Sequence, residues 1–315
     1  MNNLVSVVVT SYNHAEYLRQ RMESLIRQTH AALQIVVVDD CSRDNSMEVL
    51  KAYEGMPRVK IVGLDKNIGY AGACNLGVSL CEGEFIMFAE CDDFNEPEHV
   101  ATLLEKLLEN EGVGVAFCRS NVVDSGGILL GDDFQVRNKR FRDLCSRDTL
   151  IEKRVMQDFL LSACVIPNMS AALIRKAYLE LAGGLSSLFK ASADWDFWCH
   201  MSELCDFYYV CRPLNNFRTH PTTVRNSFGL RLQMSEAFDF LHKFARRLDL
   251  KGARLFSFKL ELSVIWAGRF RGNRINWIKS FPYIWRDSFK YDKLSILYLF
   301  GAAVVKAIEA IRPKP

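Results

Sequence analysis

The sequence predicts an α/β protein in which helices cover both faces of a mostly parallel sheet. Two observations lead to this prediction. Over residues 1–118, short β-branched or aromatic runs alternate with amphipathic stretches, a pattern typical of parallel strands joined by helices. The 315-residue chain is also 49% hydrophobic and 24% charged. These values are ordinary for a globular protein and exclude a disordered chain, a collagen-like fibre or a small disulfide scaffold.

Each element follows from its local pattern. Leu18, Met22 and Leu25 recur at helical spacing, and a second such series from Val100 to Leu108 follows Pro97, which we expect in the first helical turn. Five short apolar runs are the predicted strands, at 5–10, 34–38, 59–64, 85–89 and 114–118.

Beyond residue 118 the pattern is less regular. Residues 119–165 contain turn signals without clear periodicity, so we expect irregular structure there. Two more strands are predicted, at 169–174 and at 207–210 before Pro213. A helix is predicted at 194–204. From about residue 228 the chain reads as helical, with interruptions at Gly252, Gly268, Gly272 and Pro282.

Charge divides the chain unevenly. Residues 231–315 contain 17 basic and 7 acidic residues, whereas residues 1–230 contain 23 basic and 30 acidic ones. The tail also holds 15 of the 36 aromatic residues. A basic, aromatic tail on an acidic body favours an anionic surface as partner, either a membrane or a nucleic acid.

The ten cysteines include no CxxC pair, so we expect neither a zinc site nor a redox motif, and we expect reduced thiols in a cytoplasmic protein. The first apolar run is too short for a signal peptide. The longest uncharged run, 294–305, has twelve residues, and a spanning helix needs about 20. We therefore expect no transmembrane span.

Polar side chains follow three of the predicted strands. Thr10 ends the first and Tyr12 follows it, Asp40 follows the second, and Glu90 and Asp92 follow the fourth. Ligands of parallel α/β sheets bind at the carboxyl ends of the strands. Two acids one residue apart face the same side of an extended chain, and carboxylates suit Mg²⁺ or Mn²⁺. The alternatives are a polar helix entry, a solvated loop and an acidic turn.

Two more candidates lie further along the chain. Asp194 opens the predicted 194–204 helix among aromatic residues, where it would act as a helix cap or as a general base. His220 follows the last predicted strand, and a lone histidine is more often structural. No P-loop, GxGxxG, HExxH, GxSxG or zinc pattern occurs.

An ordered set of segments resembles glycosyltransferase family 2, with its GT-A fold. The set runs from Val5 to about Ser227: VSVVVTSYNH, SLIRQTH, QIVVVDDCSRDNS, NIGYAGACNLGVSLCEGEFIMF, AECDDFNEP, SADWDFW and FRTHPTT. The resemblance implies a sugar-nucleotide donor, a divalent metal and inversion at the anomeric carbon. It also implies a GT-A catalytic domain over 1–227, with the nucleotide sugar bound by about 1–118 and the acceptor by about 119–227. A basic helical region over 228–315 would follow.

The resemblance also implies a role for each candidate residue. The nucleoside would be held by Thr10, Tyr12 and Asp40. Glu90 stands at the first position of the family's Asp-x-Asp motif, which touches ribose or metal, and Asp92 stands at the last position, the metal ligand. Asp194 would be the general base, and His220 would ligate the metal or the diphosphate.

The chain departs from the family pattern at four positions. Glu90 replaces a commoner Asp, Cys74 replaces an Arg found in many members, Ala193 replaces a Glu, and His200 replaces a frequent Arg. These changes make the acceptor side the least transferable part of the resemblance.

The expected function is sugar transfer from a nucleotide-diphosphate sugar, UDP-linked in the first instance, with Mn²⁺ or Mg²⁺. The expected acceptor is a cell-surface glycan such as O-antigen or capsule, free or lipid-linked. The tail would bind the anionic cytosolic face of the inner membrane, and we expect no nucleic acid partner. The alternatives are a sugar nucleotidyltransferase and a catalytically degenerate member that binds a nucleotide or acts as a scaffold.

Overall fold

The computed structural model describes residues 3–220 and 229–269, together with some residues between 282 and 301. The chain divides into two compact units, which are described separately. Unit 1 comprises Met1–Gln157 and Cys164–Pro221, and unit 2 comprises Asp158–Ala163 and Thr222–Pro315.

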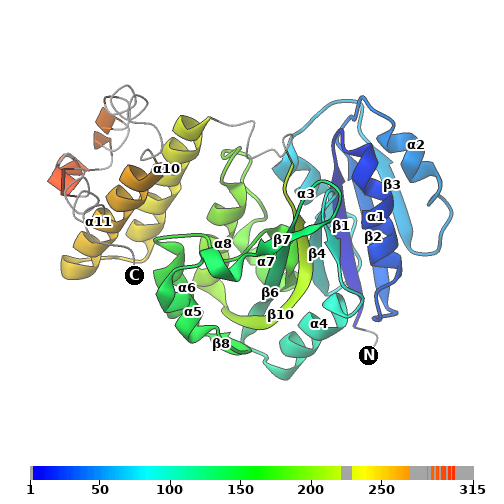
Figure 1. Ribbon diagram of the computed structural model, residues 1–315, viewed down its shortest axis with the longest axis horizontal. Coiled ribbons are helices and arrows are strands. Elements are labelled where there is room, and N and C mark those ends of the chain that lie inside the picture. Colours follow the sequence, from blue (N-terminus) through cyan, green and yellow to red (C-terminus); the bar gives the residue numbers. More distant parts are fainter. Residues whose placement is uncertain are drawn as a thin grey trace. The chain divides into compact units, whose positions relative to one another are not determined.

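A ten-stranded sheet forms the centre of unit 1 (Figure 1). Its main path runs in the order β3-β2-β1-β4-β9-β6-β10-β5, while β7 pairs with β6 and β8 pairs with β10. The strands are β1 (Val5–Ser11), β2 (Leu33–Asp39), β3 (Val59–Gly63), β4 (Phe85–Glu90), β5 (Phe94–Asn95), β6 (Val113–Val123), β7 (Leu129–Asp132), β8 (Thr149–Ile151), β9 (Ala172–Arg175) and β10 (Asp206–Arg218).

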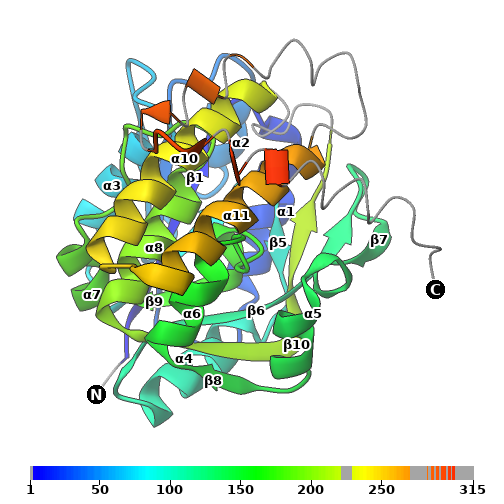
Figure 2. The same ribbon diagram turned by 90° about the vertical axis from the view of Figure 1, so that its left-hand side faces the viewer.

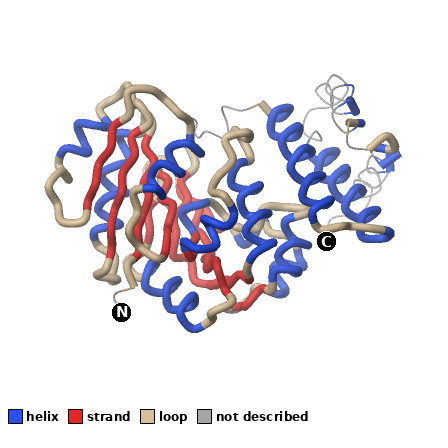
Figure 3. The backbone as a smooth tube through the Cα atoms, turned by 180° about the vertical axis from the view of Figure 1, so that it is seen from behind, coloured by secondary structure: helices blue, strands red, loops and turns tan. Residues whose placement is uncertain are grey.

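The sheet combines a parallel part with antiparallel additions. Strands β3, β2, β1 and β4 are mutually parallel, as are β6 and β10. β9 lies between these groups and runs antiparallel to both β4 and β6. Figure 3 shows the long strands side by side. The parallel first half means that β1, β2 and β4 end at the same edge of the sheet, where a ligand site is expected.

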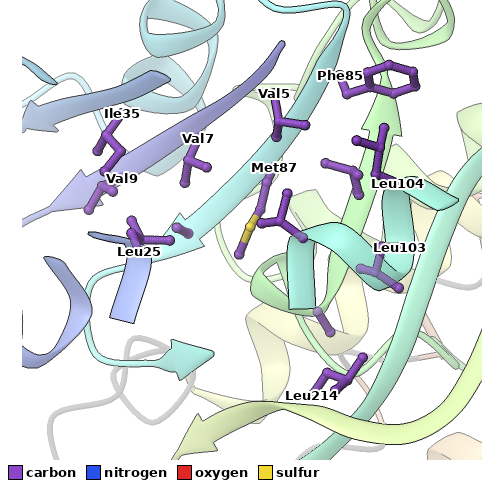
Figure 4. Close-up of a cluster of buried hydrophobic side chains, with 14 of the residues drawn as sticks. Val5, Val7, Val9, Leu25, Ile35, Phe85, Met87, Leu103, Leu104 and Leu214 are labelled. Atoms are coloured by element: carbon purple, nitrogen blue, oxygen red, sulfur yellow. The ribbon is translucent and has the colours of Figure 1, made fainter. Parts of the chain in front are cut away.

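Helices cover both faces of the sheet, as predicted. α1 and α4 supply Leu25, Leu103 and Leu104 to a core that also contains Val7 and Met87 (Figure 4). The helices and 3₁₀ turns of unit 1 are α1 (Ala15–Ile26), α2 (Ser46–Lys51), α3 (Tyr70–Ser79), α4 (His99–Glu109), η1 (Phe134–Val136), α5 (Lys139–Leu144), η2 (Met169–Ala171), α7 (Lys176–Ala182) and α8 (Ala193–Leu204). α6 (Lys153–Leu160) crosses the boundary between the units.

The opposite face is covered by α3 and α8. Phe88 of β4 meets Phe197 of α8 with ring centroids 6.3 Å apart. On α3, a Cβ atom at Gly77 would lie 2.3 Å from a methyl carbon of Val8. The missing side chain therefore lets α3 lie directly against β1, which places the start of α3 close to the strand ends.

Several expectations about the middle of the chain were wrong. Residues 119–165 are largely ordered, because β6 extends to Val123 and is followed by β7, η1, α5, β8 and α6. β7, η1, α5, β8 and α6 are each too short for a helical or strand periodicity to be recognised in the sequence. The predicted strand at 169–174 begins as the 3₁₀ turn η2 and becomes β9 only at Ala172. Pro97 precedes α4, which begins at His99.

The last strand is much longer than predicted. β10 runs from Asp206 to Arg218 and passes through Pro213. Its register against β6 shifts on both sides of that proline. Proline lacks an N–H and is tolerated in a strand at such bulges. The extension past Pro213 carries the chain to His220.

Unit 2 contains the helices α10 (Leu230–Arg247) and α11 (Gly252–Arg269). Buried Phe240, Leu241 and Phe244 give α10 an apolar core side. The predicted break at Gly252 is confirmed, α11 continues through Gly268, and Gly272 lies outside the described residues. Among the described residues, no helix combines the length and apolarity needed to cross a bilayer. None of the ten cysteines, all of which lie within the described residues, forms a disulfide bond.

Candidate active site

The strand ends bring the predicted donor residues together. Thr10 at the end of β1 is the Cα partner of Glu90 at the end of β4. On the other side, the backbone N–H of Asp40 donates to the carbonyl of Ser11 at 2.8 Å. Residues from three separate predicted segments therefore lie at one edge of the sheet. Tyr12, in the loop that follows β1, is 42% exposed.

Asp39 and Asp40 organise the loops around this edge. The buried Asp39 carboxylate accepts hydrogen bonds from the hydroxyls of Ser11 and Ser42 at 2.9 and 2.6 Å. The two Asp40 oxygens accept from the backbone N–H groups of Ile68 and Gly69 at 2.7 and 2.9 Å. Asp40 thus holds the turn that opens α3. Each of its oxygens has a second lone pair with which it can accept another bond.

Beside these loops lies an open cavity of about 300 Å³, lined by Asn13, His14, Ala15, Glu16, Asp44 and Asn45. Asp44 accepts a 3.0 Å hydrogen bond from the backbone N–H of Ala15 at the start of α1. The cavity therefore lies at the end of α1 nearest the strand edge.

A buried arginine holds the first half of the turn from Glu90 to Asp93. Arg21 of α1 is fully buried and donates through Nε to the carbonyl of Glu90 at 2.9 Å. It also bonds Asn95, and it donates to the Ser170 hydroxyl at 3.3 Å. That hydroxyl lies 2.9 Å from the backbone nitrogen of Glu90. The backbone of Glu90 is therefore held at both its N–H and its carbonyl.

The second half of the turn is held by the end of β10. His220 Nε2 lies 2.9 Å from an Asp92 carboxylate oxygen. Arg218 Nε donates to the backbone carbonyl of Asp92 at 2.7 Å, and the Arg218 N–H donates to Asp93 at 3.0 Å. The His220 ring also meets the His14 ring edge-on, with centroids 5.2 Å apart. The predicted Asp92 and His220 are thus direct neighbours, although 128 residues separate them in sequence.

The surroundings shift the pKa values of the two adjacent carboxyls of this turn in opposite directions. Burial opposes ionisation of Asp92, but the hydrogen bond from His220 and the charge of His14 outweigh it and lower the pKa of Asp92. Burial, followed by the neighbouring Asp92 charge, raises the pKa of Asp93 to about 7. The negative charge of the pair therefore concentrates on Asp92, the carboxylate that also contacts His220.

Asp194 lies in the first turn of α8 and is partly buried. The cap position of this helix is Ser192, so the alternative of Asp194 as the cap is wrong. One Asp194 oxygen accepts from the next backbone N–H, that of Trp195, at 2.8 Å. Tyr70, at the start of α3, has Glu90 and Asp194 among the charges that raise its pKa, after burial and Cys74. Asp194 and the β4 end are therefore both close to the start of α3.

The sequence did not single out Arg21 or Arg218. The sequence does indicate that Arg21 is buried. It lies three residues after Leu18 and four before Leu25, a spacing that places it on the buried side of α1. Arg218 stands two residues before His220 in the segment FRTH. Its role depends on the unpredicted extension of β10.

Within the described part of the chain, no group of three or more His, Cys, Asp or Glu side chains has the arrangement of a metal site. The nearest approach is the pair formed by Asp92 and His220. A carboxylate and an imidazole suit Mn²⁺, and the carboxylate suits Mg²⁺. In this arrangement the His220 Nε2 is engaged with the Asp92 carboxylate, so the carboxylate is the group of this pair that suits a divalent cation.

Comparison with known proteins decides the family. Residues 6–161, about half of the chain, match the family model Glycosyl transferase family 2. This chain is a family 2 member. The matched region includes β1, β2 and β4, and with them Thr10, Asp40 and Asp92.

The chain is also similar in sequence to individual proteins. Glycosyltransferase GlyG of Streptococcus pneumoniae is 32% identical over 152 residues, which are 47% of this chain and 50% of that protein. Chondroitin synthase of Escherichia coli is 24% identical over 251 residues, which are 79% of this chain and 33% of that protein. The chain therefore spans half or less of the length of these two relatives.

Solved structures share the GT-A fold. Residues 1–349 of Staphylococcus aureus TarS, in complex with UDP-GlcNAc, superpose with a TM-score of 0.67 at 17% identity, covering 90% of this chain and 79% of that one. The mannosyltransferase PcManGT of Pyrobaculum calidifontis, in complex with GDP-Man and Mn²⁺, gives a TM-score of 0.54 at 15% identity, covering 99% and 76%. At these low sequence identities, the structural similarity shows a shared fold and nothing more.

Proposed function

We propose that the chain is an inverting glycosyltransferase that moves a sugar from a nucleoside diphosphate to an acceptor hydroxyl of a cell-surface glycan. One observation carries the proposal: in a family 2 chain, Asp40, Glu90 and the pair of Asp92 with His220 converge on one edge of the sheet. Unit 1 is then the catalytic domain.

The donor would lie along the ends of β1, β2 and β4. Thr10, Tyr12 and Asp40 would contact the nucleoside, and Glu90 the ribose or the cation. UDP is our first choice of nucleotide, because TarS binds UDP and UDP-GlcNAc. The exposed Tyr12 ring offers an aromatic face on which a base can stack.

Asp92 would ligate a Mn²⁺ or Mg²⁺ ion, and His220 would ligate the same ion or contact the diphosphate after releasing its hydrogen bond to Asp92. When bound, such a cation offsets the negative charge that grows on the departing diphosphate. The protein's own contribution is to keep Asp92 ionised and fixed: His220 binds its carboxylate, and Arg218 binds its backbone carbonyl.

Asp194 would take the proton from the acceptor hydroxyl. An inverting transfer needs a base on the face of the sugar opposite the leaving group. Asp194 comes from α8, an element separate from the strand ends that would hold the diphosphate. Attack by the acceptor oxygen on the anomeric carbon, with departure of the nucleoside diphosphate, then inverts the configuration in one step.

The acceptor is proposed from the relatives. Chondroitin synthase and hyaluronan synthase are named for polysaccharides, which supports a growing glycan, free or lipid-linked, as the acceptor. The basic tail after residue 230 would hold the enzyme on the cytosolic face of the inner membrane.

The proposal is tested by incubating the full chain with a panel of UDP-, GDP- and dTDP-sugars and assaying the released phosphates. Release of a nucleoside diphosphate is the expected result. Release of pyrophosphate would indicate a sugar nucleotidyltransferase instead. Nucleotide binding without turnover, with or without glycan acceptors, would indicate a degenerate member. The anomeric configuration of the product, read by NMR, tests inversion.

A further inference from the structure

Unit 1 carries an exposed aliphatic strand flanked by basic residues. Ile128, Leu129 and Leu130 are 68%, 62% and 61% exposed, and Val136 is 82% exposed. The first three are consecutive, at the edge strand β7. A run of three exposed aliphatic residues is unusual in a soluble protein unless it binds something.

Basic residues lie in the segment that follows this strand. Residues 134–147 contain five basic residues and one acidic residue, Asp143. Of the acidic residues that flank this segment, Asp132 and Asp133 pair with Arg119 and Arg137, and Asp148 accepts a hydrogen bond from the backbone N–H of Cys211. Arg137, which pairs with Asp133 at 2.8 Å, is only partly exposed and is left out. Lys139, Arg140 and Arg147 are exposed. We name the set Ile128, Leu129, Leu130, Val136, Lys139, Arg140 and Arg147 the β7–α5 surface. Figure 2 shows β7 and α5 toward the same side of unit 1.

The β7–α5 surface is held in place by its own contacts. Asp124 accepts from the backbone N–H groups of Gly126 and Ile128, both at 2.9 Å, which closes the turn before β7. Asn138 caps α5 by accepting from the backbone N–H of Phe141 at 2.8 Å. Arg142 donates to the carbonyl of Gln135 at 2.9 Å, which ties α5 to η1. The exposed side chains therefore belong to an ordered platform.

The chemistry of this surface selects the partner. Aliphatic side chains beside lysine and arginine suit the boundary between acyl chains and anionic headgroups. A second copy docked on the same surface would bring like charges together. Binding to single-stranded nucleic acid uses exposed aromatic rings, whereas the exposed apolar residues here are all aliphatic.

The platform adjoins the candidate active site. Arg218, which binds the Asp92 carbonyl, also donates through Nη1 to the Ser125 carbonyl at 2.7 Å and the Asp124 carbonyl at 3.2 Å. A single side chain, Arg218, therefore bonds both the turn that leads into β7 and the turn that carries Asp92.

We propose that the β7–α5 surface docks unit 1 onto an anionic phospholipid membrane. This contact is separate from the tail and does not depend on the proposed reaction. It would bring the turn before β7, which Arg218 ties to the turn that carries Asp92, close to the bilayer; any benefit for a lipid-linked acceptor rests on the proposed function.

The test is flotation of the full chain with vesicles of phosphatidylcholine alone or mixed with phosphatidylglycerol, at low and high salt. An apolar variant, Ile128→Ser with Leu129→Ser and Leu130→Ser, and a charge variant, Lys139→Gln with Arg140→Gln and Arg147→Gln, are compared with wild type. Leu181→Ser with Leu188→Ser is the apolar control, since both residues are exposed elsewhere. Lys51→Gln with Lys60→Gln and Lys66→Gln is the charge control.

We expect salt-sensitive binding to the anionic vesicles only. The charge variant should lower the partition coefficient roughly 100-fold, and the apolar variant roughly tenfold or more. Both controls should bind like wild type, and unchanged thermal melting shows that the variants fold.

Three results would overturn the proposal. If either variant binds the vesicles as well as wild type does, the binding belongs to the tail. If controls and variants weaken binding equally, the effect is one of total charge or apolarity. If wild type does not float with the anionic vesicles, the surface does not bind a membrane, and loss of self-association in the apolar variant, measured by sedimentation, would assign it to a second copy.

Discussion

The guanidinium of Arg218 donates a 2.7 Å hydrogen bond to the backbone carbonyl of Asp92. The same side chain lies between two aromatic rings, with its central carbon 4.7 Å from the Tyr17 ring centroid and 5.4 Å from that of Phe94. A buried cation is costly unless it is fully bonded. Here the bonds go to the turn that carries the metal-binding candidate, so the stability of the fold and the geometry of the site depend on one residue.

Replacing Arg218 by Met should destabilise the protein by about 3 kcal/mol. The change removes donors to the carbonyls of Asp92, Asp124 and Ser125, each bond contributing about 1 kcal/mol net. Urea unfolding followed by circular dichroism measures the loss. Arg27→Met is the matched control, because its ion pair with Glu23 is exposed and should contribute less than about 0.5 kcal/mol. Equal losses of unfolding free energy in the two variants would show that the Arg218 bonds stabilise the protein no more than an exposed ion pair does.

Replacing Asp92 by Asn should abolish the enhancement of nucleotide binding by Mn²⁺. The amide keeps the shape of the side chain but lacks the charge that a hard cation needs. Calorimetric titration of UDP, with Mn²⁺ and with EDTA, gives the comparison. Asp143→Asn, at an exposed carboxylate of α5, should behave like wild type. Full activity of the wild type in EDTA would contradict the metal assignment.

Replacing Asp194 by Asn should lower turnover roughly 10²–10⁴-fold, the usual contribution of a general base. The amide oxygen can still accept from the Trp195 N–H, and thermal melting of the variant checks that it folds. The KM for the donor should stay the same, because the donor contacts lie at the strand ends. Asp196→Asn is the comparison, since Asp196 is buried and 3.7 Å from His200. Should Asp196→Asn lose activity while Asp194→Asn keeps it, the base is Asp196.

Replacing His99 by Met should make the protein more resistant to mild acid. Burial, aided by the charge of Arg21, lowers the pKa of His99 from 6.5 to about 3. The unfolded chain therefore takes up this proton near pH 6.5, and the folded protein does so only near pH 3. Stability from this residue is complete above pH 6.5 and falls by about 1.4 kcal/mol per pH unit as the pH drops towards 3.

Urea unfolding of wild type and His99→Met at pH 6.5 and 4.5 isolates this residue, since the other groups titrate in both proteins. The difference in unfolding free energy should change by roughly 2–3 kcal/mol in favour of the variant. His30→Met, at a partly exposed histidine, serves as the control. A difference that stays constant between the two pH values would rule out the effect.

The parallel half of the sheet and its polar strand ends were predictable because each strand there is a continuous apolar run. Val5–Ser11 and Phe85–Glu90 are buried on both faces, and composition alone marks such strands. The placement of Asp92 against His220 was not predictable from spacing. It depends on β10 continuing past Pro213 through two register shifts. A prediction from the local sequence ends the strand before such a proline. The resemblance to family 2, rather than the residues themselves, suggested that His220 belongs to the site.

Arg218 binds the turn before β7 through the carbonyls of Asp124 and Ser125 and not through their side chains. Every amino acid supplies the same carbonyl, so these two bonds do not depend on the side chains at 124 and 125, whereas the turn itself is closed by the Asp124 carboxylate. The segment beyond Ser125 can therefore differ in sequence without changing the bonds that Arg218 makes to the turn. An element attached only through backbone atoms is free to vary while the turn that carries Asp92 stays fixed.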